Sequence, residues 1–460
     1  MIQNRSPWIH QLKRTRPVVP LGRDLSTDLV IVGGGIAGVV TAFFILRDTD
    51  QSVVLLEADK IAHGATGHNA GQITSYFERS FYSMVDEFGL LHASEGQHAV
   101  ESAWDLLEEI CRMAELQVPY YTFMGYAGYS TFEQIEGHLK NNALRVQGGL
   151  PMETMLIADD YARIGDISPL YDALYTKVAR ARIMELLETK NPDYVAVKSY
   201  KKGCMNSALF SEQLINYLTI KYPDRFSFFE ESPVTIITLE EQGHTSKVRD
   251  HLVKSKRTVL CTNGFDGFHI FNRTGHQIDP SFHAIVNGRI GYMTAYLEQK
   301  PLKPAANSYF PLLQETTGDP MGEAYFYLTR RPYGEDGESI SGLVSAAGPE
   351  KVLPNRAVYD RKEEAPEDIQ MAIDDFLQKN YREYPKDNPK YEFFWHGLMG
   401  YTPNRIRRIG PEPHHPSLMY NLGCNGVGIL PSIYGGKKIA QFINGETLSS
   451  SIFDPHDTTQ

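Results

Sequence analysis

Two short apolar runs lie close together near the start of the chain, at 27–32 and 52–57. Neither run alternates with polar residues, which is typical of parallel strands that are buried on both faces. Between them, apolar residues return at helical spacing, at Ile36, Val39, Val40, Phe43 and Phe44. The pattern predicts a strand, a helix and a second strand, which together form the repeating unit of α/β folds.

A membrane-spanning helix is the alternative for this region, because residues 29–46 form an uncharged run that follows several basic residues. The run fits a membrane span poorly, since Gly33, Gly34 and Gly35 interrupt it and Asp28 adjoins it. A buried strand, a glycine turn and a buried helix explain the same residues. We therefore expect no membrane partner.

The glycines between the first strand and the helix have the spacing Gly33-x-Gly35-x-x-Gly38. In a dinucleotide-binding fold, the first allows a tight turn, the second lets the backbone approach a pyrophosphate, and the third lets helix and strand pack closely. Glu57 ends the second strand 19 positions after Gly38, where an acidic side chain accepts hydrogen bonds from ribose hydroxyls. These residues predict a dinucleotide cofactor and leave NAD and FAD both open.

A loop of small and polar residues follows the second strand, with the sequence GATGHNAGQ from Gly64 to Gln72. Its glycines and alanines allow a large group to approach the backbone closely. A simple nicotinamide-binding domain does not need such a loop, whereas FAD is longer and bends so that its flavin passes nearby. The loop therefore favours FAD.

This loop and four later motifs resemble the D-amino-acid oxidase and sarcosine oxidase superfamily of flavoproteins. The later motifs are GCMNSALFSEQLINYL at 203–218, ESPVTIITLE at 231–240, RTVLCTNGF at 257–265, and a closing signature formed by FWHGLMGYTPNRIRRIGP at 394–411 and MYNLGCNGVGI at 419–429. The resemblance is thinnest at 116–200 and 271–390. It implies an α/β fold, in which a Rossmann-like FAD-binding domain of the glutathione-reductase type joins an α+β substrate domain built on an antiparallel sheet.

The resemblance also implies which residues contact FAD. Val234 would contact the adenine through its backbone, and the helix expected after Gly428 would direct its N-terminus at the flavin and stabilise negative charge there. The expected cofactor-binding residues are Gly33, Gly35, Ile36, Ala37, Gly38, Glu57, Ala58, Gly64, Ala65, Thr66, His68, Asn69, Gly71, Gln72, Val234, Thr262, Asn263, Gly264, Gly397, Asn425, Gly426, Val427, Gly428 and Ile429.

Two alternatives remain for His68. In the dimethylglycine and sarcosine dehydrogenase branch, a histidine in a G-x-T-x-H-x-A-G setting is bonded covalently to the flavin, and residues 64–71 have the same spacing. Covalent attachment requires a neutral imidazole. The other alternative is a noncovalent contact with the cofactor or packing within the loop.

The motifs predict a discontinuous FAD domain at 24–115, 199–270 and 392–460, and a substrate domain at 116–198 and 271–391. Residues 1–23 form a polar lead-in that we expect along the surface. Residues 79–116 have helical periodicity, the aromatic-rich segments at 120–132 and 323–331 predict antiparallel strands, and 366–381 predicts an amphipathic helix.

The resemblance implies oxidation of a C–N bond in a primary or secondary amine, or in an amino acid, by hydride transfer to flavin N5; the imine then hydrolyses. Where the amino-acid-oxidising branch has an arginine for the substrate carboxylate, this chain has Met399. The pocket is then less polar, or the carboxylate is held elsewhere. The expected substrate-site residues are Tyr325, Tyr327, Met399 and Arg330, with Arg331 beside it and with core packing or a surface role as alternatives.

Two departures from the family pattern affect finer detail. Asn404 and Arg407 stand where the closing motif usually has an aspartate and a proline. The segment SISGLVSAAG at 339–348 lacks the lysine that sarcosine oxidases use to activate oxygen. Oxygen and another electron acceptor therefore both remain open.

Charge and cysteine content narrow the remaining classes. The chain has 45 basic and 56 acidic residues and a net charge of −11, which disfavours nucleic acid as a partner. Its four cysteines form no metal motif, so we expect reduced thiols, a cytoplasmic enzyme and no metal. A nicotinamide-dependent dehydrogenase and a flavoprotein acting in RNA modification remain as alternatives, and the oligomeric state stays open.

Overall fold

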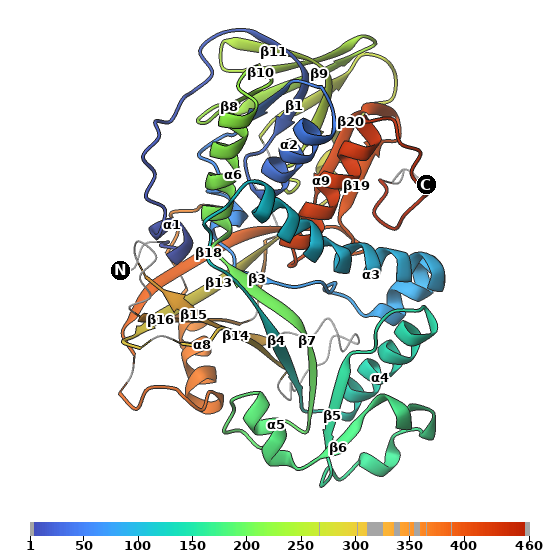
Figure 1. The fold of residues 1–460 in the computed structure, drawn as a ribbon, viewed down its shortest axis with the longest axis vertical. Coiled ribbons are helices and arrows are strands. Elements are labelled where there is room, and N and C mark those ends of the chain that lie inside the picture. Colours follow the sequence, from blue (N-terminus) through green and yellow to red (C-terminus); the bar gives the residue numbers. More distant parts are fainter. Residues whose placement is uncertain are drawn as a thin grey trace.

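The computed structural model describes residues 4–265, 267–300, 302–310, 325–334, 341–348, 350–353, 359–364, 366–387 and 389–455. The molecule contains two large sheets, which follow one another along its long axis (Figure 1). The first lies at the upper end with α2, α6 and α9, and the second at the lower end with α4, α5 and α8. No described helix is both long and apolar enough to cross a bilayer.

The first sheet contains nine strands in the described part of the chain. Its centre is parallel: β1 pairs with β2 on one side and with β11 on the other. The last four residues of β1 are buried, as expected of a central strand. The strands are β1 (Leu25–Val32), β2 (Val53–Leu56), β8 (Phe226–Phe229), β9 (Val234–Glu240), β10 (Gly243–Val248), β11 (His251–Leu260), β12 (His269–Asn272), β19 (Arg408–Glu412) and β20 (His415–Leu422).

The helices of this half pack closely on one another and on the sheet. A Cβ added at Gly38 would lie 1.9 Å from the Gly33 carbonyl oxygen, so only glycine lets α2 begin this close to β1. At Gly436 it would lie 3.0 Å from the Thr41 nitrogen, where α9 crosses α2. The helices are α2 (Ile36–Asp48), α3 (Phe81–Met113), α6 (Ser207–Lys221), α7 (Asp279–Ala284), α9 (Ile429–Ile443) and the short η1 (Ala65–Gly67).

The second sheet has eleven strands in the described residues and is mostly antiparallel. They are β3 (Gln72–Ile73), β4 (Tyr120–Tyr129), β5 (Thr154–Ala158), β6 (Thr176–Val178), β7 (Ala196–Met205), β13 (Asn287–Glu298), β14 (Ala305–Phe310), β15 (Phe326–Tyr333), β16 (Ser341–Ala347), β17 (Lys351–Leu353) and β18 (Tyr391–Tyr401). The helices beside it are α4 (Phe132–Gln147), α5 (Arg180–Leu186), α8 (Glu367–Asn380), η2 (Ile164–Asp166) and η3 (Pro169–Leu174).

Two strands carry the chain across the expected domain boundaries at 199 and 392. β7 pairs with β4 along its whole length, and β18 pairs with β13, so both belong to the second sheet. The chain returns to the first sheet only after these strands end. A strand remains in its sheet for as long as it pairs with its neighbour. The chain therefore passes from one sheet to the other where a strand ends, and not where a sequence motif begins.

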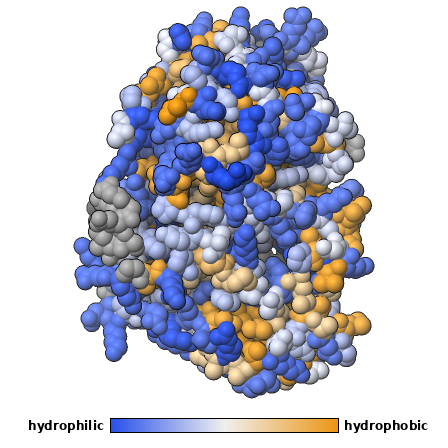
Figure 2. All heavy atoms as spheres, in the orientation of Figure 1, coloured by the Kyte–Doolittle hydropathy of each residue, from blue (hydrophilic) through white to orange (hydrophobic). Residues whose placement is uncertain are grey.

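The surface is largely hydrophilic in the view of Figure 2, and apolar residues gather toward the lower end of the molecule. Exposed apolar side chains at this end include Val146 of α4, Met152, which follows α4, and Leu170 of η3. Exposed apolar side chains are ordinary on folded proteins, because apolar atoms contribute more than half of the accessible surface.

The N-terminal segment is anchored more firmly than its polar composition suggests. It forms the short helix α1 (Pro7–His10), and Trp8 is fully buried. The Trp8 Nε1 donates to the Asn69 carbonyl oxygen at 2.6 Å, and the Trp8 ring meets the Trp395 ring edge-on at 6.3 Å between centroids. The expectation of a segment along the surface is therefore wrong at this point, because the indole has an apolar pocket and a hydrogen-bond acceptor inside the molecule.

We expect Trp8→Ala to lower the free energy of unfolding by about 3–5 kcal/mol, since it removes a fully buried aromatic side chain and leaves a cavity. Denaturant titration measures this loss. Val19→Ala is the matched control, because Val19 lies in the same segment and is 48% exposed. Equal stability of the two variants would show that the N-terminal segment does not support the core.

Candidate active site

A cavity of about 720 Å³ lies where the two halves of the molecule meet. Its wall includes the carboxyl ends of β1, β2 and β11 from the first sheet, and parts of β13 and β18 from the second. Ligands of open α/β sheets bind outside the carboxyl ends of the strands. The volume is also in the range of about 300–1,000 Å³ that is usual for ligand and cofactor sites.

The turn after β1 forms one part of the wall. Gly33 has a φ of 108°, in the region that favours glycine. The Glu57 carboxylate accepts hydrogen bonds from the N–H groups of Gly34 at 2.6 Å and Asp59 at 2.9 Å. Burial raises the pKa of Glu57, and the two N–H donors oppose that shift. The carboxylate is thus fixed at the cavity with acceptor capacity left for a hydroxyl.

Two helices begin at the cavity with a glycine as the N-cap residue. The N-cap residues of α2 and α9 are Gly35 and Gly428, and neither offers a side chain to the first turn. Thr66 supplies one acceptor, since its Oγ1 accepts from the Ile36 N–H at 2.9 Å. Helix N-termini of this kind bind anions. The turn after β1 and the first turns of α2 and α9 together form a cradle, and this cradle fits the phosphates of a dinucleotide.

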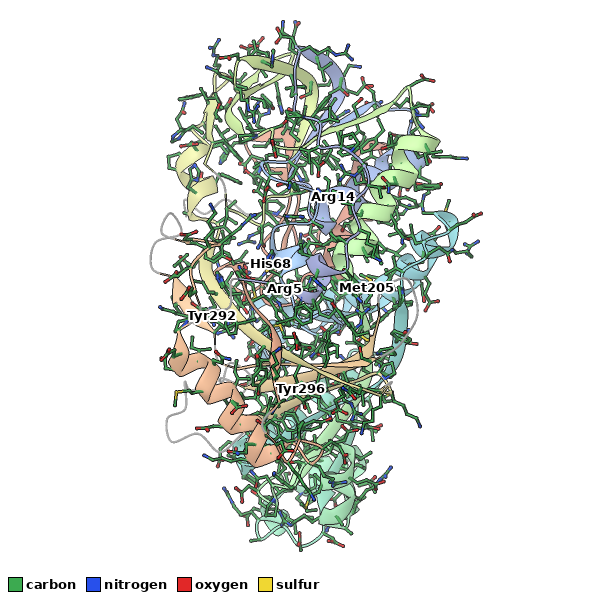
Figure 3. The ribbon with its side chains drawn as sticks, turned by 90° about the vertical axis from the view of Figure 1, so that its left-hand side faces the viewer. Arg5, Arg14, His68, Met205, Tyr292 and Tyr296 are labelled. Atoms are coloured by element: carbon green, nitrogen blue, oxygen red, sulfur yellow. The ribbon has the colours of Figure 1, made fainter. Side chains whose placement is uncertain are left out.

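His68 lies between the two halves of the molecule, as Figure 3 shows. Its Nδ1 lies 3.0 Å from the Gly64 carbonyl oxygen. Because a carbonyl only accepts, Nδ1 carries the proton and Nε2 keeps its lone pair. Burial lowers the pKa of His68 to about 4, so the ring is neutral at physiological pH. The loop lies directly against β18, since a Cβ added at Gly397 would be 2.7 Å from the His68 carbonyl oxygen.

Most of the residues expected at the cofactor line the cavity. They are Gly33, Gly35, Ile36, Ala37, Glu57, Ala58, Gly64, Ala65, Thr66, His68, Asn69, Gln72, Val234, Thr262, Asn263, Gly397, Gly426, Val427, Gly428 and Ile429.

Four expected residues lie behind the wall and support it. Gly38 packs on the Gly33 carbonyl, Gly71 on the Trp8 ring and Gly264 on Val286. Asn425 is buried, and its Oδ1 accepts from the Thr402 N–H at 2.8 Å. These residues shape the cavity without lining it, because their close contacts leave no space for a ligand.

Of the expected substrate-site residues, Tyr325, Tyr327 and Met399 line the cavity and Arg330 does not. The Arg330 guanidinium binds Glu188 at 2.6 Å and the Tyr381 hydroxyl at 3.3 Å. Alternation along β15 explains the difference, because Arg330 lies on the face opposite to Tyr327. We therefore do not include Arg330 in the site.

Two residues near this site, Arg331 and His396, also have structural partners. Arg331 shares a face with Tyr327 but is buried, with its guanidinium 5.0 Å from the Trp8 ring centroid. His396 is buried on β18, and its Nε2 lies 2.9 Å from the Glu363 carbonyl oxygen. Neither side chain lines the cavity.

Four charged residues at the cavity were given no role from the sequence: Glu78, Glu350, Arg361 and Arg407. Arg407 is buried, and its guanidinium donates to the Asn421 side chain at 2.7 Å. Burial lowers its pKa to about 10, so it remains a cation at neutral pH. Glu78 and Glu350 line the cavity at the end formed by the second sheet. No sequence motif identifies Glu78 or Glu350 as residues of the site. Arg407 could have been identified, because it stands where the family usually has a proline.

A sequence model of the family described as FAD dependent oxidoreductase (DAO) matches residues 28–442. Among solved structures, glycine oxidase from Geobacillus kaustophilus superposes with a TM-score of 0.68 at 14% identity, over 94% of this chain and 98% of that one. This similarity confirms the expected fold, with a Rossmann-like FAD domain and a second domain.

Two curated relatives match only locally. A Rieske-type 2Fe-2S iron-sulfur protein of Bacillus subtilis (strain 168) is 32% identical over 90 residues, which are 20% of this chain and 18% of the relative. Gamma-glutamylputrescine oxidoreductase of Escherichia coli (strain K12) is 32% identical over 74 residues, 16% of this chain and 17% of the relative. The chain thus spans less than a fifth of the length of each.

The family match covers far more than half of the chain and excludes a nicotinamide-dependent dehydrogenase as the alternative. The resemblance to the D-amino-acid oxidase superfamily is confirmed, and with it the cofactor, since the family is FAD-dependent. The chain belongs to the DAO family of FAD-dependent oxidoreductases.

Proposed function

We propose that this enzyme oxidises the C–N bond of an amine to an imine, which then hydrolyses, and that FAD, when bound, would supply the hydride acceptor. One observation carries the proposal: a single cavity joins the glycine-lined cradle to a pocket lined by Tyr325, Tyr327 and Met399. Bound FAD supplies the redox chemistry. The protein has to hold the amine beside it and keep water out.

The residues that line the cavity divide the work of holding FAD. We propose that the N-termini of α2 and α9 face its charged groups, and that Glu57 accepts from a ribose hydroxyl. Val234 would contact the adenine through its backbone, and His68 would lie against the flavin. Arg407 adds a buried positive charge to the same cavity, which favours a cofactor with two phosphates.

Met399 supports an amine over an α-amino acid as substrate. Its side chain lines the cavity beside Gly291 and cannot bind a carboxylate. Among the described lining residues, Arg361 and Arg407 are the cations, and both are engaged elsewhere, with Asp59 at 3.0 Å and with Asn421. Burial raises the pKa of Tyr327 above its usual value, so its hydroxyl stays protonated and neutral.

The relatives are compatible with this substrate class. Glycine oxidase and gamma-glutamylputrescine oxidoreductase act, by their names, on amino compounds. The first shares only the fold at 14% identity, so it supports the type of chemistry and not a particular substrate.

Amines should reduce the flavin faster than glycine, sarcosine or D-amino acids when each is mixed anaerobically with the purified enzyme. The missing carboxylate partner should weaken carboxylate binding by about 1.5–3 kcal/mol, or about ten- to a hundred-fold. Bleaching of the flavin absorbance measures the reaction. Fast reduction by glycine with inert simple amines would contradict the proposal.

Introducing a charged donor at position 399 should increase the affinity for an amino acid. Met399→Arg should improve the apparent Kd for glycine by about tenfold or more, because it restores a charged donor in the pocket. Met124→Arg is the control, since Met124 is 51% exposed.

Arg407→Met should weaken FAD binding by about tenfold or more, because it removes a buried charge from the cofactor cavity. Titration of the apoprotein with FAD, followed by flavin fluorescence, measures the Kd. Arg408→Met is the matched control: Arg408 is the next residue of the chain and does not line the cavity. Equal losses in the two variants would point to general damage instead of cofactor contact.

His68→Ala should reduce FAD retention, and acid precipitation of the unmodified enzyme should leave the yellow colour in the supernatant. We expect a noncovalent contact because the hydrogen bond from His68 Nδ1 to the Gly64 carbonyl oxygen holds the neutral ring in place. A yellow pellet would instead demonstrate a covalent bond at the neutral imidazole. Unchanged FAD affinity and turnover in His68→Ala would remove His68 from the site.

A further inference from the structure

Two carboxylates stand at the substrate end of the cavity, and the reaction proposed above does not use them. Glu78 lies in the segment between β3 and α3, and its Oε1 accepts from the Tyr325 hydroxyl at 2.8 Å. Glu350 lies before β17, and its Oε1 accepts from the Tyr401 hydroxyl at 3.0 Å. Phenol donors leave the remaining carboxylate lone pairs available to another donor.

Tyrosine rings surround the Glu78 carboxylate. Tyr76, Tyr325 and Tyr327 all line this end of the cavity. The Tyr76 and Tyr325 hydroxyls lie 3.3 Å apart, and the rings of Tyr325 and Tyr327 are 5.7 Å apart between centroids. Aromatic faces together with carboxylates are the chemistry that binds an ammonium group.

The Glu78 carboxylate has no cationic partner among the described residues. Arg405 donates to the backbone carbonyl of Glu78 at 2.8 Å and not to its carboxylate. Lys202 is fully buried nearby, and its Nζ binds Gln72 at 3.3 Å and Ser308 at 3.2 Å. The carboxylate therefore lines the cavity without a direct ion pair among the described residues, and the charge of Arg405 acts on it only at longer range.

The negative charge of Glu350 is only partly balanced by a neighbouring cation. Arg289 approaches its Oε2 to 3.6 Å, while the Arg289 guanidinium stacks 4.5 Å from the centre of the Tyr401 ring. Burial and the neighbouring Glu350 raise the pKa of Glu78 to about 7. Two carboxylates at the same end of one cavity favour a bound cation, since it offsets both desolvation and mutual repulsion.

The acidic pair lies beside the loop before α9. A Cβ added at Gly426 would be 2.8 Å from Glu78 Cγ and 2.6 Å from the Tyr401 hydroxyl. A small cavity of about 60 Å³ lies on the other side of Glu78 and shares Tyr76, Glu78, Ser308 and Tyr325 with the large one. Arg79, Arg145 and Lys198 line this small cavity, so a cationic group is favoured on the side of Glu78 that faces the large cavity.

Resting on the amine oxidation proposed above, we propose that the substrate carries a second ammonium group, as a diamine or polyamine does. Glu78 and Glu350 bind this second group within the ring of tyrosines, and the first amino group is thereby held for oxidation. A monoamine would leave both carboxylates without a cation. An ω-amino acid of the same length would place a carboxylate against them.

The test uses the FAD-loaded enzyme under anaerobic conditions with three probes of matched chain length: putrescine, n-butylamine and γ-aminobutyrate. Perturbation of the flavin spectrum gives the Kd of each, and bleaching gives the rate of reduction. We expect a Kd for putrescine about ten- to a hundred-fold lower than for n-butylamine, with γ-aminobutyrate weakest, because one added charge-assisted contact is worth that factor.

Glu78→Gln should raise the Kd for putrescine by about tenfold or more and leave that for n-butylamine nearly unchanged. Glu350→Gln should act in the same direction, and its partly exposed side chain makes it the safer variant for folding. Glu87→Gln is the control, since Glu87 lies on α3 outside the cavity. FAD content and thermal melting of each variant report whether it folds.

The outcomes separate the two proposals. Putrescine that binds in a manner dependent on Glu78, while no amine bleaches the flavin, would support the cation site and overturn amine oxidation. Equal Kd values for putrescine and n-butylamine, or equal effects of both Gln variants on all three probes, would overturn the cation site and leave amine oxidation standing. Failure of putrescine to bind would also overturn the cation site.

Discussion

The cavity depends on one carbonyl oxygen, that of Asn69, which accepts hydrogen bonds from two indoles. Trp8 donates to it at 2.6 Å and Trp395 at 3.1 Å. A carbonyl has two lone pairs, so this oxygen is fully used. The N-terminal segment, the loop at 64–72 and β18 are joined at this point. His68 of the loop and Gly397 of β18 lie against each other at this junction, and the two halves of the molecule enclose the cavity.

The balance of charge differs between the two ends of the cavity. The cofactor end has two helix N-termini and the buried Arg407 beside the single carboxylate of Glu57, whereas the pocket of tyrosines has Glu78 and Glu350. An anionic cofactor and a cationic substrate would therefore each meet a complementary end. Both attractions are stronger inside the molecule than on its surface, because charges interact more strongly away from water.

Local features of the sequence predicted the cofactor half, and long-range pairing determined the rest. The spacing of Gly33, Gly35 and Gly38 predicts the first turn because each constraint acts within a few residues. Glu78 and Glu350 meet only through the arrangement of the second sheet, which no local pattern encodes. The sequence does contain the alternation that separates Arg330 from Tyr327, but assigning faces requires knowing which side of β15 meets the cavity.

The joining of distant segments at Asn69 has a consequence for the order of assembly. Trp395 lies 326 residues from Asn69 along the chain, so this half of the support forms only after most of the protein has been made. Contacts of such long range are slow to form, since closing the intervening chain costs entropy before any contact compensates it. We therefore expect the cofactor to bind late in biogenesis, and a bound flavin would stabilise the last contacts to form.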